Sequence, residues 1–193
     1  NGPIKPIGNN ITAQVIVYYD DFFNFSNDQV DPNEYFNKTF QLVEQALHNR
    51  SIMLNLTVTK TEQNDSLLVF VNSSRENKVD GNATLQKLIK FGQGAPPNTL
   101  NYVFMWQDLN TGKADALHTN NTFCTQEPSA AIVQTAPVEG FYQTAYKLTI
   151  FTLGSTHTPQ PSETDYKKMN ETFRRCPHGV DKARKPAEPQ AKA

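Results

Sequence analysis

The chain has 193 residues and a formal net charge of −1. This length suits one domain with a sizeable hydrophobic core, and the balanced charge gives no electrostatic case for a nucleic-acid partner. No run of about 18 consecutive apolar residues occurs in the sequence, so we expect no membrane-spanning helix.

The first half of the chain has the patterns of alternating strands and helices. Residues 13–19 are rich in β-branched and aromatic side chains, which favours a strand. Residues 31–48 begin with an aspartate N-cap and a proline and then repeat apolar residues at helical spacing, which predicts a helix. The same patterns predict a half-buried strand over 51–61, a short extended segment over 67–71 and a helix over 81–92.

The second half leads up to a central helix. Residues 100–106 and 129–135 predict buried strands, and residues 114–118 predict an edge strand. Residues 140–153 are apolar around most of a helical circumference, which predicts a helix buried in the core. A last helix is expected over 162–175, because its first turn carries acidic residues.

Ten N-x-Ser/Thr sequons are spread along the chain. A sequon is the acceptor of N-glycosylation in secreted proteins, and its asparagine must be exposed. About two or three matches would be expected by chance in a chain rich in Asn and Thr, so we expect a secreted, extracellular glycoprotein that carries N-glycans. The acceptor residues are Asn10, Asn24, Asn37, Asn49, Asn55, Asn64, Asn72, Asn82, Asn120 and Asn170.

Cys124 and Cys176 are the only cysteines in the sequence. In an oxidising compartment, two cysteines of one domain are expected to form a disulfide. Such a bridge would contribute roughly 3–4 kcal/mol by restricting the unfolded chain. Two cysteines with one nearby histidine do not make a zinc site, so we do not expect the pair to bind metal.

The central helix ends in the sequence L-G-S-T-H at 153–157. This ending resembles the H-E-x-x-H-x-x-G-x-x-H motif of metzincin zinc proteases of the reprolysin (ADAM-like) type, in which three histidines bind zinc and the glutamate is the general base. Two histidines and the glutamate of the motif are replaced here, whereas the glycine and the last histidine are kept. The motif positions hold Lys147, Leu148, Phe151, Gly154 and His157.

The resemblance implies an α/β fold in a single metzincin-like domain over residues 1–176. Its sheet would be twisted and mostly parallel with one antiparallel edge strand, two helices packed on it, the central former zinc helix and a short C-terminal helix. Residues 177–193 have few apolar side chains, and we expect a disordered polar tail. The pairing of Cys124 with Cys176 also fits reprolysins, and the Cys-poor layout looks most like secreted reprolysin-type proteins of tick saliva.

The replaced motif residues imply a pseudoprotease with no catalytic residue, no metal and no cofactor. Lys147 places a positive charge where a zinc ligand should lie, and this charge opposes a divalent cation. A retained scaffold with an emptied site implies that the protein binds an extracellular protein, such as a host immune or haemostatic factor. The former substrate cleft, between residues 114–118 and the end of the central helix, is the expected binding surface.

Three alternatives belong to other functional classes. A small-ligand carrier of the lipocalin type would need a barrel, which the strong helical patterns oppose. A zinc protease with a rebuilt site would need His118 or His178 to meet His157. A hydrolase based on Ser155 and His157 is disfavoured, because two residues of one turn do not form a triad and no G-x-S-x-G elbow occurs.

Overall fold

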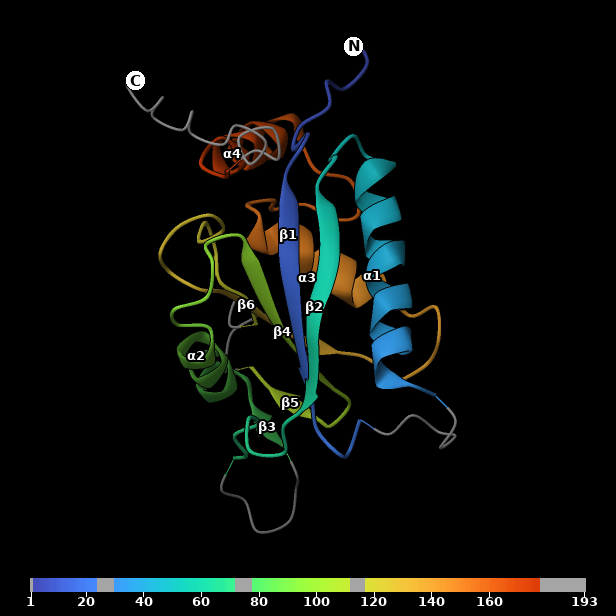
Figure 1. The fold of residues 1–193 in the computed structure, drawn as a ribbon, viewed down its shortest axis with the longest axis vertical. Helices are drawn as coiled ribbons and strands as arrows, with labels where there is room; N and C mark the ends of the chain where they lie inside the picture. Colours follow the sequence, from blue (N-terminus) through green and yellow to red (C-terminus); the bar gives the residue numbers. More distant parts are fainter. Residues whose placement is uncertain (1, 24–29, 72–77, 112–116, 178–193) are drawn as a thin grey trace, which may run out of the picture.

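The computed structural model describes residues 2–23, 30–71, 78–111 and 117–177. Four parallel strands form the central sheet in the order β2-β1-β4-β6 (Figure 1). They are β1 (Thr12–Tyr19), β2 (Asn55–Gln63), β4 (Thr99–Met105) and β6 (Ser129–Gln134). Two short strands, β3 (Val79–Asp80) and β5 (Leu109–Asn110), pair in parallel beside this sheet.

Four helices complete the described fold, and three of them cover the sheet. They are α1 (Pro32–His48), α2 (Gly81–Phe91), α3 (Gln143–Thr152) and α4 (Glu163–Arg174). In Figure 1, α3 crosses behind the sheet, α1 lies beside β2, and α4 lies at the end where β1 begins. No helix within the described ranges combines the length and the apolar character needed to cross a bilayer.

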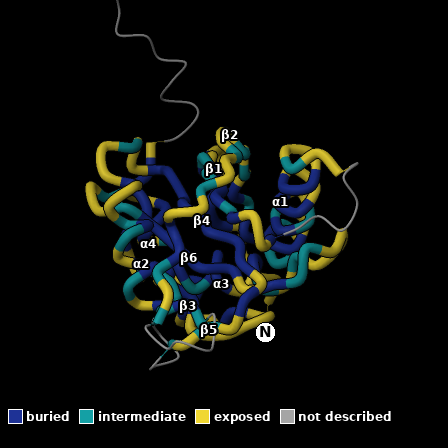
Figure 2. The backbone as a smooth tube through the Cα atoms, turned by 90° about the horizontal axis from the view of Figure 1, so that it is seen from below, coloured by how far each residue is buried: buried dark blue, intermediate teal, exposed yellow. Residues whose placement is uncertain are grey.

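The core consists of two layers, one on each face of the sheet. Successive residues of a strand point to opposite faces. Val15 and Phe104 pack in the cluster that contains the buried residues of α1 and α3. Tyr18 and Ile132 belong to the second cluster, to which α2 contributes the buried Leu85 and Leu88. Figure 2 shows that the buried stretches of the chain lie toward the middle of the molecule, in the strands and along the helices.

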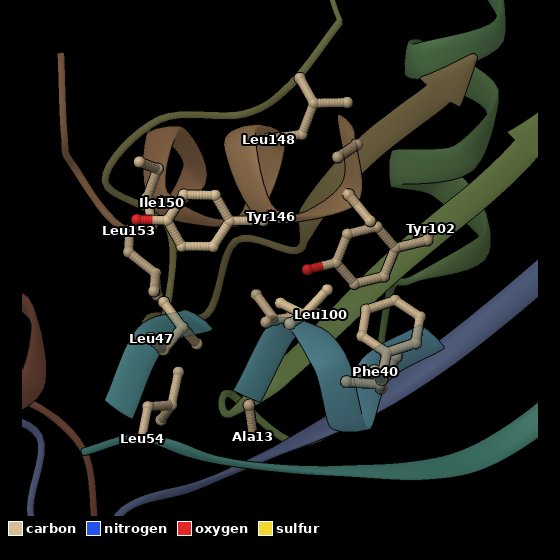
Figure 3. Packing of buried hydrophobic residues seen from close by; sticks show 14 of the residues in the cluster. Ala13, Phe40, Leu47, Leu54, Leu100, Tyr102, Tyr146, Leu148, Ile150 and Leu153 are labelled. Carbon is tan, nitrogen blue, oxygen red and sulfur yellow. The ribbon is translucent and has the colours of Figure 1, made fainter. Parts of the chain in front are cut away.

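A buried hydroxyl pair attaches α3 to the sheet. The Tyr102 hydroxyl lies 2.6 Å from Thr149 Oγ1, and Thr149 Oγ1 donates to the carbonyl oxygen of Ala145 at 2.7 Å. Both hydroxyls are therefore satisfied although Tyr102 and Thr149 are buried. Figure 3 shows Tyr102 and Phe40 between α1, β4 and α3.

The predicted fold class is confirmed, because the chain is a single α/β domain with a mostly parallel sheet. The N-cap of α1 is also as predicted, since the Asp31 carboxylate accepts a hydrogen bond from the Asn33 N–H at 3.0 Å. The antiparallel edge is shorter than predicted and consists of one bridge between His118 and Ala131. Residues 114–116 of the predicted edge strand and residues 178–193 of the predicted tail lie outside the described residues.

Two predicted boundaries are wrong by a few residues, and each for a local reason. The strand predicted from Ser51 begins at Asn55, because Ser51 has a φ of 62° and forms a turn. The helix predicted from Gly140 begins at Gln143, because Gly140 has a φ of 90°. Phe141 therefore precedes the helix and is 49% exposed instead of buried in the core.

The predicted disulfide is present. It joins Cys124, which precedes β6, to Cys176, which follows α4. The Arg175 guanidinium strengthens the same junction by donating to the carbonyl oxygens of Asn121 at 3.2 Å and Phe123 at 3.1 Å. The end of α4 is thus held to the loop before β6 by one covalent and two polar contacts.

Truncation of Phe36 tests the aromatic core. Its ring is fully buried and lies 4.8 Å from Phe104 and 6.0 Å from Phe23 between ring centroids. We expect Phe36→Ala to lower the free energy of unfolding by about 3–5 kcal/mol in urea denaturation, because it leaves a cavity. Phe22→Ala is the matched control, and about 0.5 kcal/mol or less is expected since Phe22 is 52% exposed. Equal losses in the two variants would contradict this packing.

Candidate functional site

The candidate site is the end of α3 and the turn that follows it. Gly154 has a φ of 114°, a conformation that glycine adopts without steric cost. Its N–H donates to the carbonyl oxygen of Phe151 at 3.1 Å, and the Ser155 N–H donates to that of Ile150 at 2.9 Å. These bonds end the helix at a glycine, as the sequence predicts.

Three of the residues considered in the sequence lie together on the outer side of α3. Lys147 is exposed, and its amine lies 5.9 Å from the centroid of the Phe151 ring, one helical turn further along. The His118 ring comes from the edge segment and lies 5.6 Å from the same Phe151 ring, between centroids. A cation, an aromatic ring and one imidazole therefore occupy the surface where the motif would place zinc ligands.

Leu148 is buried although it follows the exposed Lys147 on α3. It is 5% exposed and belongs to the same hydrophobic core as Tyr146, Ile150 and Leu153 (Figure 3). The position that the motif assigns to the general base thus contributes to core packing in this chain.

His157 is engaged by a buried carboxylate. Its Nδ1 lies 2.8 Å from Asp165 Oδ2, and the side chain of Asp165 is only 2% exposed. Since the ionised carboxylate can only accept, Nδ1 carries the hydrogen. Ser155 is not part of this contact, because its hydroxyl donates to the carbonyl oxygen of His157 at 2.8 Å. Ser155 and His157 therefore share a turn and do not form a nucleophile–base pair.

Asp165 is the third residue of α4 and completes a capping box with Ser162. Burial alone would raise the pKa of its carboxyl group. The N–H groups of Ser162 and Thr156, the His157 ring and the Thr156 hydroxyl all donate to the anion, and together they hold this pKa well below its usual range. The carboxylate is therefore ionised and fixes the turn between α3 and α4.

The side chains at α3 do not fit a zinc ion. Structural and catalytic zinc sites use at least three His, Cys, Asp or Glu ligands. Within the described part of the chain, no three such side chains are grouped so that they could hold a metal. His118 packs against Phe151, whereas His157 is paired with Asp165. His178, the third histidine of the alternative rebuilt site, lies outside the described residues.

Among the described residues, the edge segment beside α3 presents backbone groups that have no hydrogen-bond partner. The Leu117 carbonyl oxygen accepts from the Ile132 N–H at 2.8 Å, and the Thr119 N–H donates to the Ala130 carbonyl oxygen at 2.9 Å. In an antiparallel pair the residue between two such bonds directs its own N–H and C=O to the opposite side. The backbone of His118 thus points away from β6 and forms an open strand edge.

The sequon asparagines are accessible where the structure describes them. None of the eight is buried; Asn64 and Asn170 are half-buried, and the other six are exposed. Asn24 and Asn72 lie outside the described residues. Glycosylation at these positions stays a prediction that the exposure permits.

Three features of the site were missed by reasoning from the sequence. The spacing of Ser162 and Asp165 is a capping-box signature and could have identified their pairing. The contact of Asp165 with His157 depends on the turn between α3 and α4, and no local sequence pattern predicts it. The same holds for Arg50, which lies beside Tyr146 of α3 although the two are far apart in the sequence.

Acid titration of unfolding tests the role of Asp165. Because its pKa is lower in the folded state, the anion stabilises the fold above about pH 4, and this contribution is lost as the pH falls further. We expect Asp165→Asn to cost about 1–3 kcal/mol at neutral pH and to flatten the decline in stability below about pH 4. The control is Glu163→Gln in the same helical turn, since Glu163 is 89% exposed and should have little effect. A decline as steep in Asp165→Asn as in the wild type would contradict the assignment.

Comparison with known proteins gives a structural similarity only. No protein-family model and no curated protein sequence matches the chain. The structure is similar to the crystal structure of metalloproteinase-II from Bacteroides fragilis, with a TM-score of 0.52 and 9% identity over 88% of this chain and 55% of that one. Archaemetzincin from Methanopyrus kandleri gives a TM-score of 0.43 and 12% identity over 84% of this chain and 92% of that one.

The chain thus spans about half the length of the Bacteroides protein. At an identity this low, the similarity shows the fold and no further property. The comparison accordingly supports a metalloprotease-like fold: the chain is an α/β domain whose fold is similar to that of a metalloproteinase.

Proposed function

We propose that this protein is a secreted, glycosylated, catalytically inactive metalloprotease-like protein that acts by binding another extracellular protein. The observation that carries the proposal is the contact of Lys147 and His118 with Phe151 on the outer side of α3. An ammonium group at the first ligand position repels a divalent cation, and a phenyl ring at the second cannot coordinate one. The metalloprotease-like scaffold is retained while its ligand positions carry other chemistry.

The disulfide and the sequons support secretion. A structural disulfide is typical of proteins that fold in an oxidising compartment. Cys124 and Cys176 form one here, and the eight described sequon asparagines all reach the surface to some degree. Both features agree with an extracellular glycoprotein.

The open edge at His118 is the proposed binding surface. An extended segment of a partner can add to a free strand edge through backbone hydrogen bonds. The edge lies next to Phe151 and Lys147, which would contact the side chains of such a segment. The partner is therefore proposed to be a protein that presents an extended loop or terminus.

A finer assignment follows from the resemblance seen in the sequence. The L-G-S-T-H ending at 153–157 and the pairing of Cys124 with Cys176 resemble secreted reprolysin-type proteins of tick saliva. We accordingly propose a salivary protein of this type, with a host immune or haemostatic factor as its partner. A small-ligand carrier of the lipocalin type is not retained, because the described sheet is open and parallel instead of an antiparallel barrel.

Zinc content is the direct test of inactivity. We expect the purified, glycosylated chain to contain far less than one zinc per molecule by elemental analysis, even after incubation with zinc and gel filtration. His157→Ala should leave this value unchanged, because the variant removes no metal ligand that is in use. About one zinc per chain in the wild type, lost in His157→Ala, would overturn the proposal and indicate a rebuilt site.

Two substitutions of His118 test the proposed binding edge. His118→Pro removes the outward N–H, whereas His118→Ala keeps it and removes only the ring. We expect immobilised wild-type chain and His118→Ala to retain the same protein from host plasma, identified by mass spectrometry, and His118→Pro to lose it. Retention by all three, or by none, would argue against partner binding at this edge.

A further inference from the structure

A second feature lies on the side of α3 that faces the end of α1. A pocket of about 260 Å³ opens there, between α1, the first half of α3 and the loop at Thr158 and Pro159. Arg50 and Lys147 contribute its charged groups, and the rings of Tyr142 and Tyr146 contribute its aromatic wall. This pocket is separate from the strand edge at His118, which does not line it.

The charge of the pocket is uncompensated. None of the described residues that line it is Asp or Glu. Within the described part of the chain, neither Arg50 nor Lys147 forms an ion pair, whereas Lys38 on α1 is paired with Glu34 and Glu139. Two cations that share a concave site without an acidic partner favour an anionic ligand.

Contacts with its neighbours hold Arg50 in place before any ligand arrives. Its Nη1 donates to the carbonyl oxygen of Ala46 at 2.9 Å, and its guanidinium carbon lies 4.8 Å from the centre of the Tyr146 ring. The Tyr166 hydroxyl donates to the Arg50 carbonyl oxygen at 2.6 Å and fixes the backbone. The hydrogen bond to Ala46 is also what an arginine that merely caps the end of α1 would form. It uses one of the five N–H donors of the Arg50 guanidinium, and the other donors are left for a ligand.

The loop side of the pocket is fixed as well. The Tyr146 hydroxyl donates to the Pro159 carbonyl oxygen at 2.5 Å. Tyr146 therefore connects the loop to the ring on which Arg50 stacks, and the pocket is formed in the free protein. A preformed site loses less conformational entropy when it binds a ligand.

We infer that this pocket binds a carboxylate. A guanidinium with free donors recognises the two oxygens of a carboxylate, and Lys147, which also lines the pocket, adds a second positive charge. The volume lies below the lower end of the range for drug-sized ligands, about 300 Å³, so the pocket suits one carboxylate on a short organic group. Such a group is either a free small organic acid or an acidic side chain of a bound protein. The inference goes beyond the proposed function, because it holds whether or not zinc binds at α3.

Calorimetric titration with a matched pair of probes tests the inference. Benzoate and benzamide have nearly the same shape, and only benzoate is charged. We expect the full glycosylated chain to bind benzoate at least about tenfold more tightly than benzamide. Equal affinity for the two, or no saturable binding of benzoate, would overturn the inference.

Substitutions locate the site. Arg50→Gln and Lys147→Gln should each weaken benzoate binding about tenfold, and Arg50→Lys should fall between Arg50→Gln and the wild type, because it keeps the charge without the planar fork. Lys38→Gln is the control, since Lys38 is an exposed cation of α1 outside this pocket. Loss of binding in Lys38→Gln equal to that in Lys147→Gln would show a non-specific charge effect and contradict the site. Unchanged melting temperatures confirm that the variants are folded.

A pair of peptides distinguishes the two sources of the carboxylate. A short blocked peptide with a central Glu is compared with the same peptide carrying Gln. Preference for the Glu peptide that is lost in Arg50→Gln supports an acidic protein segment as the ligand. Binding of benzoate without binding of the Glu peptide supports a free small acid. Binding of neither carboxylate probe overturns the inference, and the zinc content of the chain decides the proposed function independently.

Discussion

The burial of α3 against the parallel sheet is the constraint on which the rest of the structure depends. Tyr102 and Thr149 meet inside the core with both hydroxyls hydrogen-bonded, so the rotation of the helix about its axis is fixed. Once this side is buried, Lys147 and Phe151 must lie on the outer side, and Gly154 must reverse the chain. Core packing thus decides which residues of this helix face the surface. The chemical types of those residues decide what the surface can bind.

Elements with local determinants could be predicted from the sequence. The Asp31 cap, the helical spacing of α1 and the glycine at the end of α3 are all encoded within a few residues. The disulfide followed from a cysteine pair with no other partner in the sequence. The start of α3 could not be predicted, because Phe141 is apolar like a core residue but lies outside the core after the turn at Gly140.

The sequence predicts which residues form the candidate site, but it does not predict the contacts between them. Alignment to a motif placed Lys147 and Phe151 at the end of the helix, but it could not show that the ring of His118 packs on Phe151. It also aligned Leu148 with the general base of the motif, but it could not show that this side chain is buried in the core. The pocket at Arg50 depends on how α1 and α3 cross, which no spacing within either helix encodes.

The bridge between Cys124 and Cys176 has a consequence for the integrity of the molecule. The two residues are 52 positions apart, and the chain between them contains β6, α3 and α4. A peptide bond cut anywhere in this interval, for example in the loop around Pro159, would leave both pieces joined through the disulfide. In a fluid rich in proteases, the part of the protein that carries α3 could thus be nicked and still remain attached to the sheet on which it packs.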